Sequence, residues 1–272
     1  MDWSNAPSAP LNVDGVALEY ACWGPPPDAA PTLVLLHEGL GSVALWRDLP
    51  AELAQRTGMG VLAYSRQGYG ASDPAPLPRP LSYMTHEATG VLPRILDLAG
   101  LSRVILLGHS DGASIASIYA GSVADHRVRG LVLIAPHYFT EPDGLAAIAR
   151  ARDAFDQGDL RQALARHHAD PENTFRGWAE AWLDPDFAAW NIGETLDYIR
   201  VPVLAIQGRR DQYGSLAQIE EVQERVYAPV DTLLLDESAH APHLEQPAPV
   251  LDAITEFTAR LWRIEAADVV PT

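Results

Sequence analysis

The chain has 272 residues, of which 47% are hydrophobic, so it can bury the core of one large domain or two small ones. Lys and Arg number 19 against 36 Asp and Glu, and the formal net charge of −17 at pH 7 argues against nucleic acid or an anionic membrane as a partner. The same charge argues mildly against a strongly anionic substrate unless arginines compensate locally.

The first residues carry an acid and lack the basic segment of an export signal. No later apolar run nears the roughly 18 residues that a membrane span needs. One cysteine, Cys22, excludes an intramolecular disulfide and a cysteine-based metal cluster. We therefore expect an unexported, cytoplasmic protein without a membrane partner, and we leave its oligomeric state open, with a homodimer as one option.

The chain then alternates between short apolar runs and segments with helical spacing. A hairpin is predicted first, with its turn at Asp14-Gly15. The apolar runs are unbroken, as in strands buried on both faces of a parallel sheet. They cover Thr32 to Leu36, Gly60 to Tyr64, Arg103 to Leu107, Gly130 to Ala135, Val201 to Gln207 and Thr232 to Leu235. The helical segments cover Leu45 to Arg56, Thr85 to Ala99, Ser114 to Val123, Ser215 to Tyr227 and Pro249 to Leu261.

This alternation predicts an α/β fold with a mostly parallel, doubly wound sheet. The alternation stops between about 137 and 200, where aromatic residues lie on helical segments without a strand-like run. We interpret 137–200 as a helical cap inserted late in a core made of 1–136 and 201–272. The tail from Ile264 to Thr272 is expected to fray.

A candidate nucleophile follows the third apolar run. Gly108-His109-Ser110-Asp111-Gly112 is a G-x-S-x-G elbow placed between a strand and a helix, as that motif requires. Small residues two positions on either side of Ser110 let the chain bend tightly enough to hold it in a strained conformation. A chance match in a glycine-containing loop is the competing interpretation, and the strand–turn–helix context favours the functional one.

A serine hydroxyl needs a base, and the base needs an orienting carboxylate. Asp211 and His240 follow the last two apolar runs, and the order Ser, Asp, His is the one expected of this architecture. His243 competes with His240, but it leads directly into a helix, so we favour His240. Loops at the carboxyl ends of parallel strands converge on one crevice, which would bring these side chains together.

Two backbone N–H groups are expected to stabilise an oxyanion. One belongs to Asp111, the residue after the nucleophile. The other lies in His37-Glu38-Gly39-Leu40-Gly41, where we choose Gly39 and keep Glu38 as the alternative. Neither a cofactor nor a metal is needed for this chemistry.

Several motifs together resemble the α/β-hydrolase superfamily over nearly the whole chain, least clearly in 137–200. They are Leu36-His37 with its glycine-rich loop, Arg66 to Asp73, the Gly108 to Gly112 elbow, Gly208 to Asp211 and His240 to Pro247. The short spacing and the inserted segment are similar to the group of carboxylesterases, enol-lactonases and carbon–carbon bond hydrolases. Epoxide hydrolases and haloalkane dehalogenases of the superfamily use an aspartate nucleophile, so the resemblance disfavours those activities for a chain with Ser110.

The chain departs from these relatives at two positions. They commonly have His-Gly where this chain has His37-Glu38, so Glu38 adds a carboxylate that could face a substrate or point away. They often carry an apolar side chain where this chain has Asp111. The charge of Asp111 would disfavour an anionic product.

The expected activity is hydrolysis of a small-molecule carboxylic ester or lactone through an acyl-enzyme. Cleavage of a carbon–carbon bond in a β-diketone or meta-cleavage-type acid by the same triad is the alternative, with Arg66, Arg209 and Arg210 as partners of the substrate carboxylate. A non-catalytic receptor on the same fold ranks lowest. Residues expected at the substrate pocket are Glu38, Tyr138, Phe139, Trp178, Trp182 and Trp190, although some of the tryptophans could instead form a core within the inserted segment.

Overall fold

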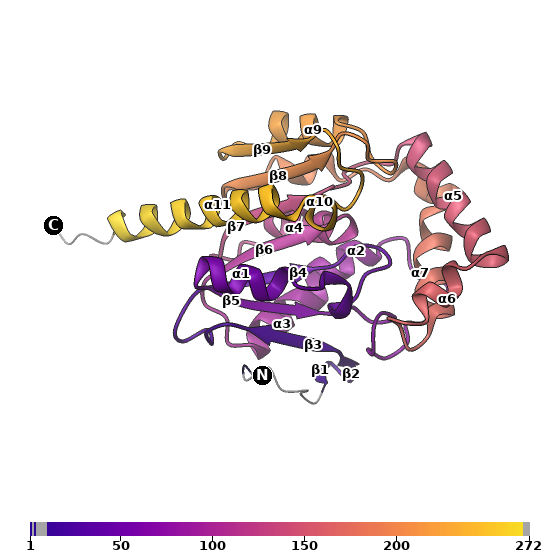
Figure 1. The fold of residues 1–272 in the computed structure, drawn as a ribbon, viewed down its shortest axis with the longest axis horizontal. Helices are drawn as coiled ribbons and strands as arrows, with labels where there is room; N and C mark the ends of the chain where they lie inside the picture. The colour runs from indigo at the N-terminus through magenta and orange to yellow at the C-terminus, as the bar shows by residue number, and fades with distance from the viewer. Residues whose placement is uncertain (2, 4–9, 269–272) are drawn as a thin grey trace.

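Seven strands form the central sheet of the computed structural model, which describes residue 1, residue 3 and residues 10–268 (Figure 1). The strand order is β3-β5-β4-β6-β7-β8-β9, and every pair is parallel except β3 with β5. The strands are β3 (Tyr20–Trp23), β4 (Thr32–Leu36), β5 (Gly60–Tyr64), β6 (Val104–His109), β7 (Val128–Ile134), β8 (Val203–Gly208) and β9 (Val230–Leu235). The mostly parallel doubly wound sheet is therefore confirmed.

All six apolar runs become strands of this sheet. The run Thr32 to Leu36 is buried at every position because helices cover both faces. The strand missing from the sequence prediction is β3, which pairs antiparallel with β5 at the sheet edge. The expected hairpin is a separate two-stranded sheet of β1 (Leu11–Val13) and β2 (Val16–Leu18). Its turn residues Asp14 and Gly15 have φ of 50° and 92°, as a two-residue hairpin turn of type I′ requires.

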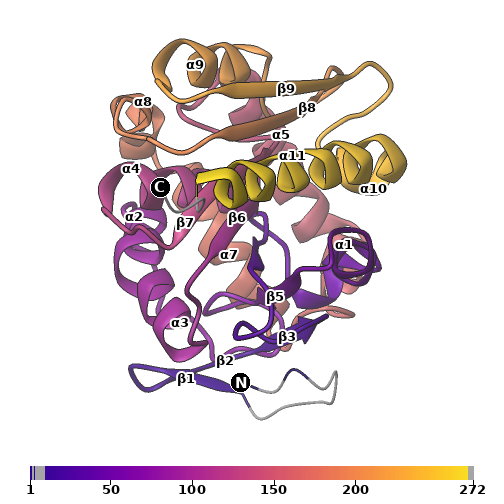
Figure 2. The ribbon, with the colours of Figure 1, turned by 90° about the vertical axis from the view of Figure 1, so that its left-hand side faces the viewer.

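Two layers of helices enclose the sheet (Figures 1 and 2). One face packs against α1 (Leu49–Thr57) and α11 (Pro247–Asp268), and the other against α3 (Leu92–Leu98), α4 (Asp111–Ser122) and α9 (Ala217–Arg225). Each face of the sheet has its own hydrophobic core, and alternate residues of β4 point into the two cores. Leu33 and Leu35 belong to one cluster, and Val34 and Leu36 belong to the other. Helix α11 continues to Asp268. The prediction that the chain frays from Ile264 was therefore wrong for residues 264–268. Residues 269–272 lie outside the described residues.

The predicted helix over Thr85 to Ala99 is divided into three pieces. They are α2 (Tyr83–His86), a π-helical turn η2 (Glu87–Val91) and α3. Pro93 lacks a backbone N–H and so cannot make the usual bond to the residue four positions earlier, which explains the wider turn before it. The predicted helix from Leu45 to Arg56 is likewise preceded by a short 3₁₀ turn, η1 (Val43–Trp46).

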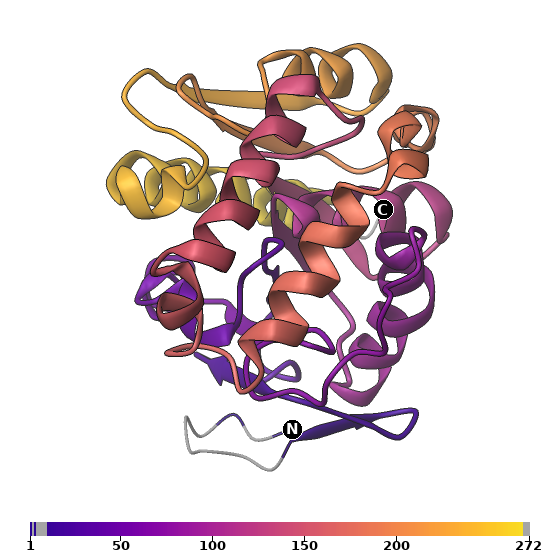
Figure 3. The ribbon, with the colours of Figure 1, turned by 90° about the vertical axis from the view of Figure 1, so that its right-hand side faces the viewer.

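The described residues between β7 and β8 form helices rather than strands. These are α5 (Pro142–Gln157), α6 (Leu160–Leu164), α7 (Pro171–Trp182), η3 (Pro185–Ala189) and α8 (Gly193–Leu196), with one isolated bridge between Phe139 and Asn191. Figure 3 views the molecule from this side and shows α5 and α7 in front of one end of the sheet. The last helix, α8, returns to contact α4 and α9. Among the described helices, none combines the length and apolar character needed to cross a bilayer.

The close approach of α4 to β4 generates a test of the fold. A Cβ at position 112 would lie 1.9 Å from the Leu36 carbonyl oxygen, which belongs to rigid backbone. We expect Gly112→Ala to lower the free energy of unfolding by about 3 kcal/mol or to prevent folding. Gly100→Ala is the control, because its Cβ would meet no atom within 4 Å and only the positive φ of 65° opposes it, at about 1 kcal/mol. Equal stability of the two variants in urea unfolding would contradict the tight contact.

Candidate active site

Ser110 lies at a sharp turn between β6 and α4. Its φ and ψ are 53° and −119°, a strained conformation for a residue with a side chain. Glycines at positions 108 and 112 permit this turn, because a Cβ at either would lie within 2.3 Å of backbone oxygens. The Ser110 N–H donates to the Ile134 carbonyl oxygen at 2.9 Å, which ties the turn to the neighbouring strand. The elbow predicted from the sequence therefore has the expected geometry.

Asp211 and His240 meet beside this turn, from the loops that follow β8 and β9. The His240 Nδ1 lies 2.9 and 2.8 Å from the two carboxylate oxygens of Asp211. Asp211 also accepts bonds from the Tyr213 N–H and from the Gln207 side-chain amide. Burial opposes ionisation of Asp211, but the hydrogen bond and charge of His240 outweigh it and hold the carboxyl pKa below its usual value. Because the carboxylate accepts at Nδ1, the Nε2 of His240 is left as the free base.

Two further contacts hold the backbone around His240. The Glu245 carboxylate, on α10 (Pro242–Glu245), accepts from the N–H groups of Ala239 at 2.5 Å and Ala241 at 3.2 Å, one on each side of the histidine. The His109 Nε2 lies 2.7 Å from the His240 carbonyl oxygen. The position of His240 is thus fixed by its ring and by its backbone.

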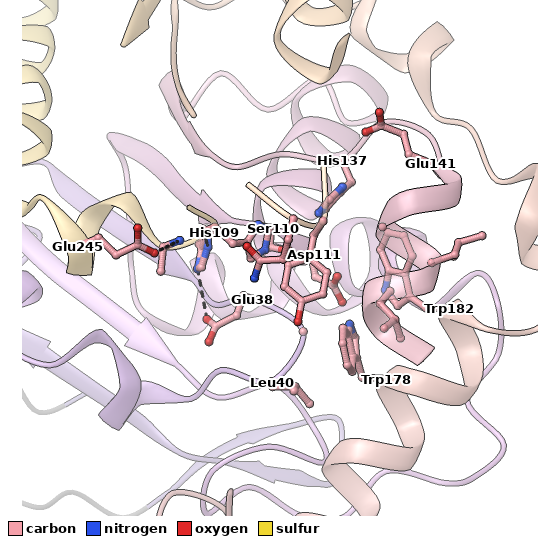
Figure 4. Close-up of a pocket in the computed structure, with 18 residues that line it drawn as sticks. Glu38, Leu40, His109, Ser110, Asp111, His137, Glu141, Trp178, Trp182 and Glu245 are labelled. Atoms are coloured by element: carbon pink, nitrogen blue, oxygen red, sulfur yellow. Dashed lines mark hydrogen bonds and ion pairs between the residues drawn. The ribbon is translucent and has the colours of Figure 1, made fainter. Parts of the chain in front are cut away.

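Ser110 and His240 line one cavity of about 280 Å³ (Figure 4). No direct hydrogen bond joins their side chains among the described residues. Such bonds are often long in empty active sites and tighten when substrate binds. Asp111 and Gly39 line the same cavity, so the two candidate oxyanion donors lie beside the candidate nucleophile.

Buried Arg66 orients the loop that carries Gly39. Its guanidinium donates to the carbonyl oxygens of His37 at 2.5 Å and Glu38 at 2.9 Å. The His37 ring accepts from the Arg66 N–H through Nε2 and donates through Nδ1 to the Glu38 carbonyl, at 3.0 and 2.7 Å. In a trans peptide the C=O and the next N–H point in opposite directions, so the Gly39 N–H points away from Arg66. That orientation leaves the Gly39 N–H free to face a ligand.

Position 39 has no room for a side chain. A Cβ there would lie 2.1 Å from the indole Nε1 of Trp178, which comes from α7. Trp178 thus covers the loop from the side of the inserted segment. The glycine is required for this close approach of Trp178, a contact that the sequence alone did not indicate.

The carboxylate of Asp111 is fully buried and linked to two side chains. Its Oδ2 accepts from the Tyr83 hydroxyl at 2.5 Å, and that hydroxyl accepts from the Trp182 Nε1 at 3.0 Å. Burial raises the pKa of Asp111 above its usual value. The chain Asp111–Tyr83–Trp182 therefore connects the elbow to helix α7.

The sequence-predicted residues divide into those that line the cavity and those that do not. Glu38, Gly39, Ser110, Asp111, Trp178, Trp182 and His240 line it, and Asp211 lies behind His240. Tyr138, Phe139 and Trp190, which the sequence also placed at the substrate pocket, do not line this cavity. Tyr138 is fully buried with its N–H bonded to Gln218, Phe139 forms the bridge to Asn191, and Trp190 stacks on Phe187 at 5.2 Å within the inserted segment. His243 also lies outside the cavity, against the rings of His109 and Trp46.

Several cavity residues were missed from the sequence. Tyr213 and His137 pack against the His240 ring, with centroids 4.8 and 5.6 Å away. Burial, followed by the charge of His240, lowers the pKa of His137 to about 3, so this ring stays neutral. His137 follows the end of β7 and Tyr213 follows the end of β8. A position just after the carboxyl end of a parallel strand is the sequence signal that could have identified both residues.

The cavity wall carries negative charge without an arginine or lysine. Its carboxylates are Glu38, Asp111, Glu141 and Glu245. In the part of the chain that the structure describes, no three His, Cys, Asp or Glu side chains are placed to hold a metal ion.

Comparison with known proteins agrees with this fold. The family model described as "alpha/beta hydrolase fold" matches residues 31–186, more than half of the chain. The sn-1-specific diacylglycerol lipase of Mus musculus is 24% identical over 261 residues, 84% of this chain and 81% of that protein. Epoxide hydrolase 2 of Siraitia grosvenorii is 32% identical over 130 residues, 47% of this chain, and the match spans only 38% of that protein.

Two solved structures have the same architecture. The esterase RhEst1 from Rhodococcus sp. ECU1013 gives a TM-score of 0.71 at 21% identity, covering 93% of this chain and 98% of that one. The enol-lactonase from Burkholderia xenovorans LB400 gives 0.68 at 22% identity, covering 92% and 98%. At this level of identity the likeness shows a shared fold. With the family match over residues 31–186, it establishes that the protein belongs to the α/β-hydrolase fold family.

Proposed function

We propose that the protein is a serine hydrolase that cleaves a carboxylic ester or a lactone through an acyl-enzyme. The observation that carries this proposal is the His240–Asp211 pair, which shares one cavity with Ser110 at its strained turn. An imidazole held by a carboxylate at Nδ1 presents Nε2 as the base that a serine nucleophile needs.

The proposed reaction follows from these positions. Ser110 Oγ attacks the carbonyl carbon while His240 Nε2 takes its proton, and Asp211 stabilises the imidazolium that forms. The N–H groups of Gly39 and Asp111 bond the oxyanion. The tetrahedral intermediate collapses, His240 protonates the leaving alkoxide, and a water molecule activated by His240 then hydrolyses the acyl-enzyme.

The cavity wall favours an uncharged acyl group. Its apolar side chains are Leu40, Leu145, Ile148, Trp178 and Trp182, and its charged side chains other than histidines are carboxylates. We infer that segment 137–200 acts as a lid, because Leu145, Ile148 and both tryptophans come from its helices α5 and α7.

The carbon–carbon bond alternative loses support at its proposed arginines. Arg66 is buried and bonded to the loop carbonyls of His37 and Glu38. Arg209 and Arg210 pair with Asp236 and Glu237 at the surface. None of the three lines the cavity, so its wall offers no arginine to a substrate carboxylate.

Replacing Ser110 tests the nucleophile. We expect Ser110→Ala to fold normally and to lose ester hydrolysis by at least about 10⁴-fold, since the step from serine to acyl-enzyme is removed. The measurement is a panel of p-nitrophenyl esters of increasing length, lactones and a β-diketone, together with fluorophosphonate labelling detected as added mass on Ser110. Ser117→Ala is the matched control, because that buried hydroxyl donates to the Ala113 carbonyl within α4 and does not line the cavity. Retained turnover in Ser110→Ala would refute the assignment.

Replacing Asp211 tests the orienting carboxylate and predicts a pH effect. We expect Asp211→Asn to lower kcat by about 10⁴-fold, because the amide no longer fixes the required imidazole tautomer. The pKa of Asp211 is lowered in the folded protein, so its contribution to stability is present above the unfolded-state value of about 3.9 and is lost as the pH falls through the folded value.

The difference in free energy of unfolding between wild type and Asp211→Asn should therefore be largest near neutral pH and should decrease as the pH falls. Urea unfolding at a series of pH values measures it, with Asp153→Asn, an exposed position on α5, as the control. A difference that grows towards acid pH would show that the folded protein does not stabilise the Asp211 carboxylate.

The acidic wall predicts discrimination between matched substrates. p-Nitrophenyl butyrate and p-nitrophenyl hemisuccinate are similar in length, but the second carries a carboxylate. We expect kcat/KM to be about tenfold or more lower for the hemisuccinate, because like charges at close range repel. Equal or faster cleavage of the hemisuccinate would contradict the inferred acyl preference and would revive the carbon–carbon bond alternative.

A further inference from the structure

The inserted segment bonds directly to the loop that carries the candidate oxyanion donor Gly39. We call residues 37–41 the oxyanion loop. His168, which lies between α6 and α7, is buried, and its Nε2 lies 3.0 Å from the Leu40 carbonyl oxygen of this loop. Its Nδ1 accepts a hydrogen bond from the Gly70 N–H at 2.9 Å. One ring from the inserted segment therefore joins two loops of the core.

The two partners of His168 fix the tautomer of its ring. A carbonyl oxygen can only accept a hydrogen bond, so Nε2 carries a proton and donates to Leu40. A backbone N–H can only donate, so the Nδ1 that faces Gly70 carries no proton. The ring is therefore neutral. Burial is the main reason why the pKa of His168 lies below its usual value, which agrees with a neutral ring.

Hydrogen bonds continue from the Leu40 carbonyl to the candidate oxyanion donor. The N–H in the same peptide unit as that carbonyl belongs to Gly41, and it donates to the Glu38 carbonyl oxygen at 3.1 Å. The Glu38 carbonyl shares its own peptide unit with the Gly39 N–H, which points the opposite way because the peptide is trans. The chain of bonds thus runs from His168 through two peptide units to the Gly39 N–H.

We propose that His168 is a positioning residue for the oxyanion hole: from the inserted segment it holds the Leu40–Gly41 peptide and, through that peptide, the Gly39 N–H. The oxyanion hole is then complete only when the inserted segment is docked on the core. The effect of His168 on turnover rests on the proposed function, whereas its effect on the order of the loop does not.

The oxyanion loop needs an anchor at this end. Arg66 bonds the carbonyls of His37 and Glu38, at the start of the loop. Leu40 lies between two glycines, and glycine has the least restricted backbone of all residues. The bond from His168 restrains this freely rotating part. Hydrogen bonds in a chain also polarise one another, so the same bond strengthens the donor at the far end of the chain.

Other contacts fasten the segment around His168 to the core. The Asn173 side chain accepts from the Ala75 N–H at 2.9 Å and donates to the Ala75 carbonyl oxygen at 2.8 Å. The Thr174 hydroxyl donates to the Gly68 carbonyl oxygen at 2.6 Å. These bonds do not involve the ring of His168. We therefore expect variants at position 168 to fold with the segment still docked, so that the loss of the ring's own bonds can be measured.

Two substitutions separate the two bonds of the ring. The amide of glutamine reaches about as far as Nε2, so His168→Gln keeps a donor for Leu40 and loses the acceptor for Gly70. The amide of asparagine reaches only about as far as Nδ1, so His168→Asn keeps the acceptor and loses the donor. The proposal depends on the bond to Leu40, so the two variants should behave differently.

Steady-state kinetics with p-nitrophenyl butyrate measures the difference. We expect His168→Asn to lower kcat about tenfold with KM nearly unchanged, because the oxyanion exists only after attack, and because loosening a donor costs less than the roughly 10²–10³-fold of deleting one. His168→Gln should stay within about twofold of the wild type. His167→Asn is the matched control: it makes the same change at the adjacent histidine, which does not line the cavity, and should leave kcat unchanged.

Hydrogen exchange of the Gly41 N–H, followed by NMR in the unliganded protein, tests the positioning without any use of activity. We expect this amide to exchange about tenfold faster in His168→Asn than in the wild type, because its bond to Glu38 opens more often once Leu40 is released. Exchange in His168→Gln and His167→Asn should match the wild type. Unchanged exchange in His168→Asn would overturn the proposal, whatever the turnover.

The kinetic comparison can also overturn it. An equal loss of kcat in both variants at position 168, no loss in either, or a larger loss in His168→Gln would show that the bond to Leu40 does not position the donor. Urea unfolding checks that both variants fold. If His168→Asn does not fold, His168→Gln decides alone: near wild-type kcat and Gly41 exchange support the proposal, and a tenfold loss of kcat overturns it. Failure of the proposed function is a separate outcome, because Ser110→Ala would then retain turnover while the exchange result stands.

Discussion

The absence of a side chain at Gly112 is the constraint on which the site depends. It allows the first turn of α4 to lie directly against the end of β4, where a Cβ would approach the Leu36 carbonyl oxygen to 1.9 Å. The N-terminal end of a helix, with its partial positive charge, is thereby brought beside the loop that holds Gly39. Ser110 takes up the strain of this junction in its φ of 53°. One backbone contact, between the start of α4 and the end of β4, therefore places the candidate nucleophile and both candidate oxyanion donors beside one another.

Buried charge then sets the orientation of the groups around that junction. Arg66 draws two loop carbonyls towards itself. Burial opposes its charged form, but electrostatic interactions with Tyr69, and then with Asp111 and Glu87, outweigh burial and raise the pKa of Arg66 above its usual value. The acidic side chain of Asp111, which the sequence suggested as a penalty for anionic products, also bonds Tyr83 and through it Trp182. A single residue thus supplies a backbone donor to the cavity and links the sheet to α7.

The features that the sequence could predict are those that leave a pattern in neighbouring residues along the chain. Unbroken apolar runs identified the six main strands, and the rule that parallel strands end at one edge predicted that Ser110, Asp211 and His240 lie together. The edge strand β3 was missed because its pairing with β5 is tertiary. Trp178 and Trp190 look alike in sequence, yet one covers Gly39 and the other packs on Phe187, since only the fold of the inserted helices separates them. The Glu38 carboxylate lies 3.5 Å from the His109 ring, and since the two residues come from two strand ends, no spacing encodes that contact.

The distribution of charge around the cavity suits a reaction that creates one positive and one negative centre. Proton transfer to His240 makes an imidazolium, and the carboxylates of Asp211 and the cavity wall lower its energy. The same carboxylates would oppose the oxyanion if nothing else faced it. Its stabilisation must then come from groups within bonding distance, where N–H dipoles outweigh more distant charges. That requirement explains why the Gly39 loop is held so firmly by Arg66.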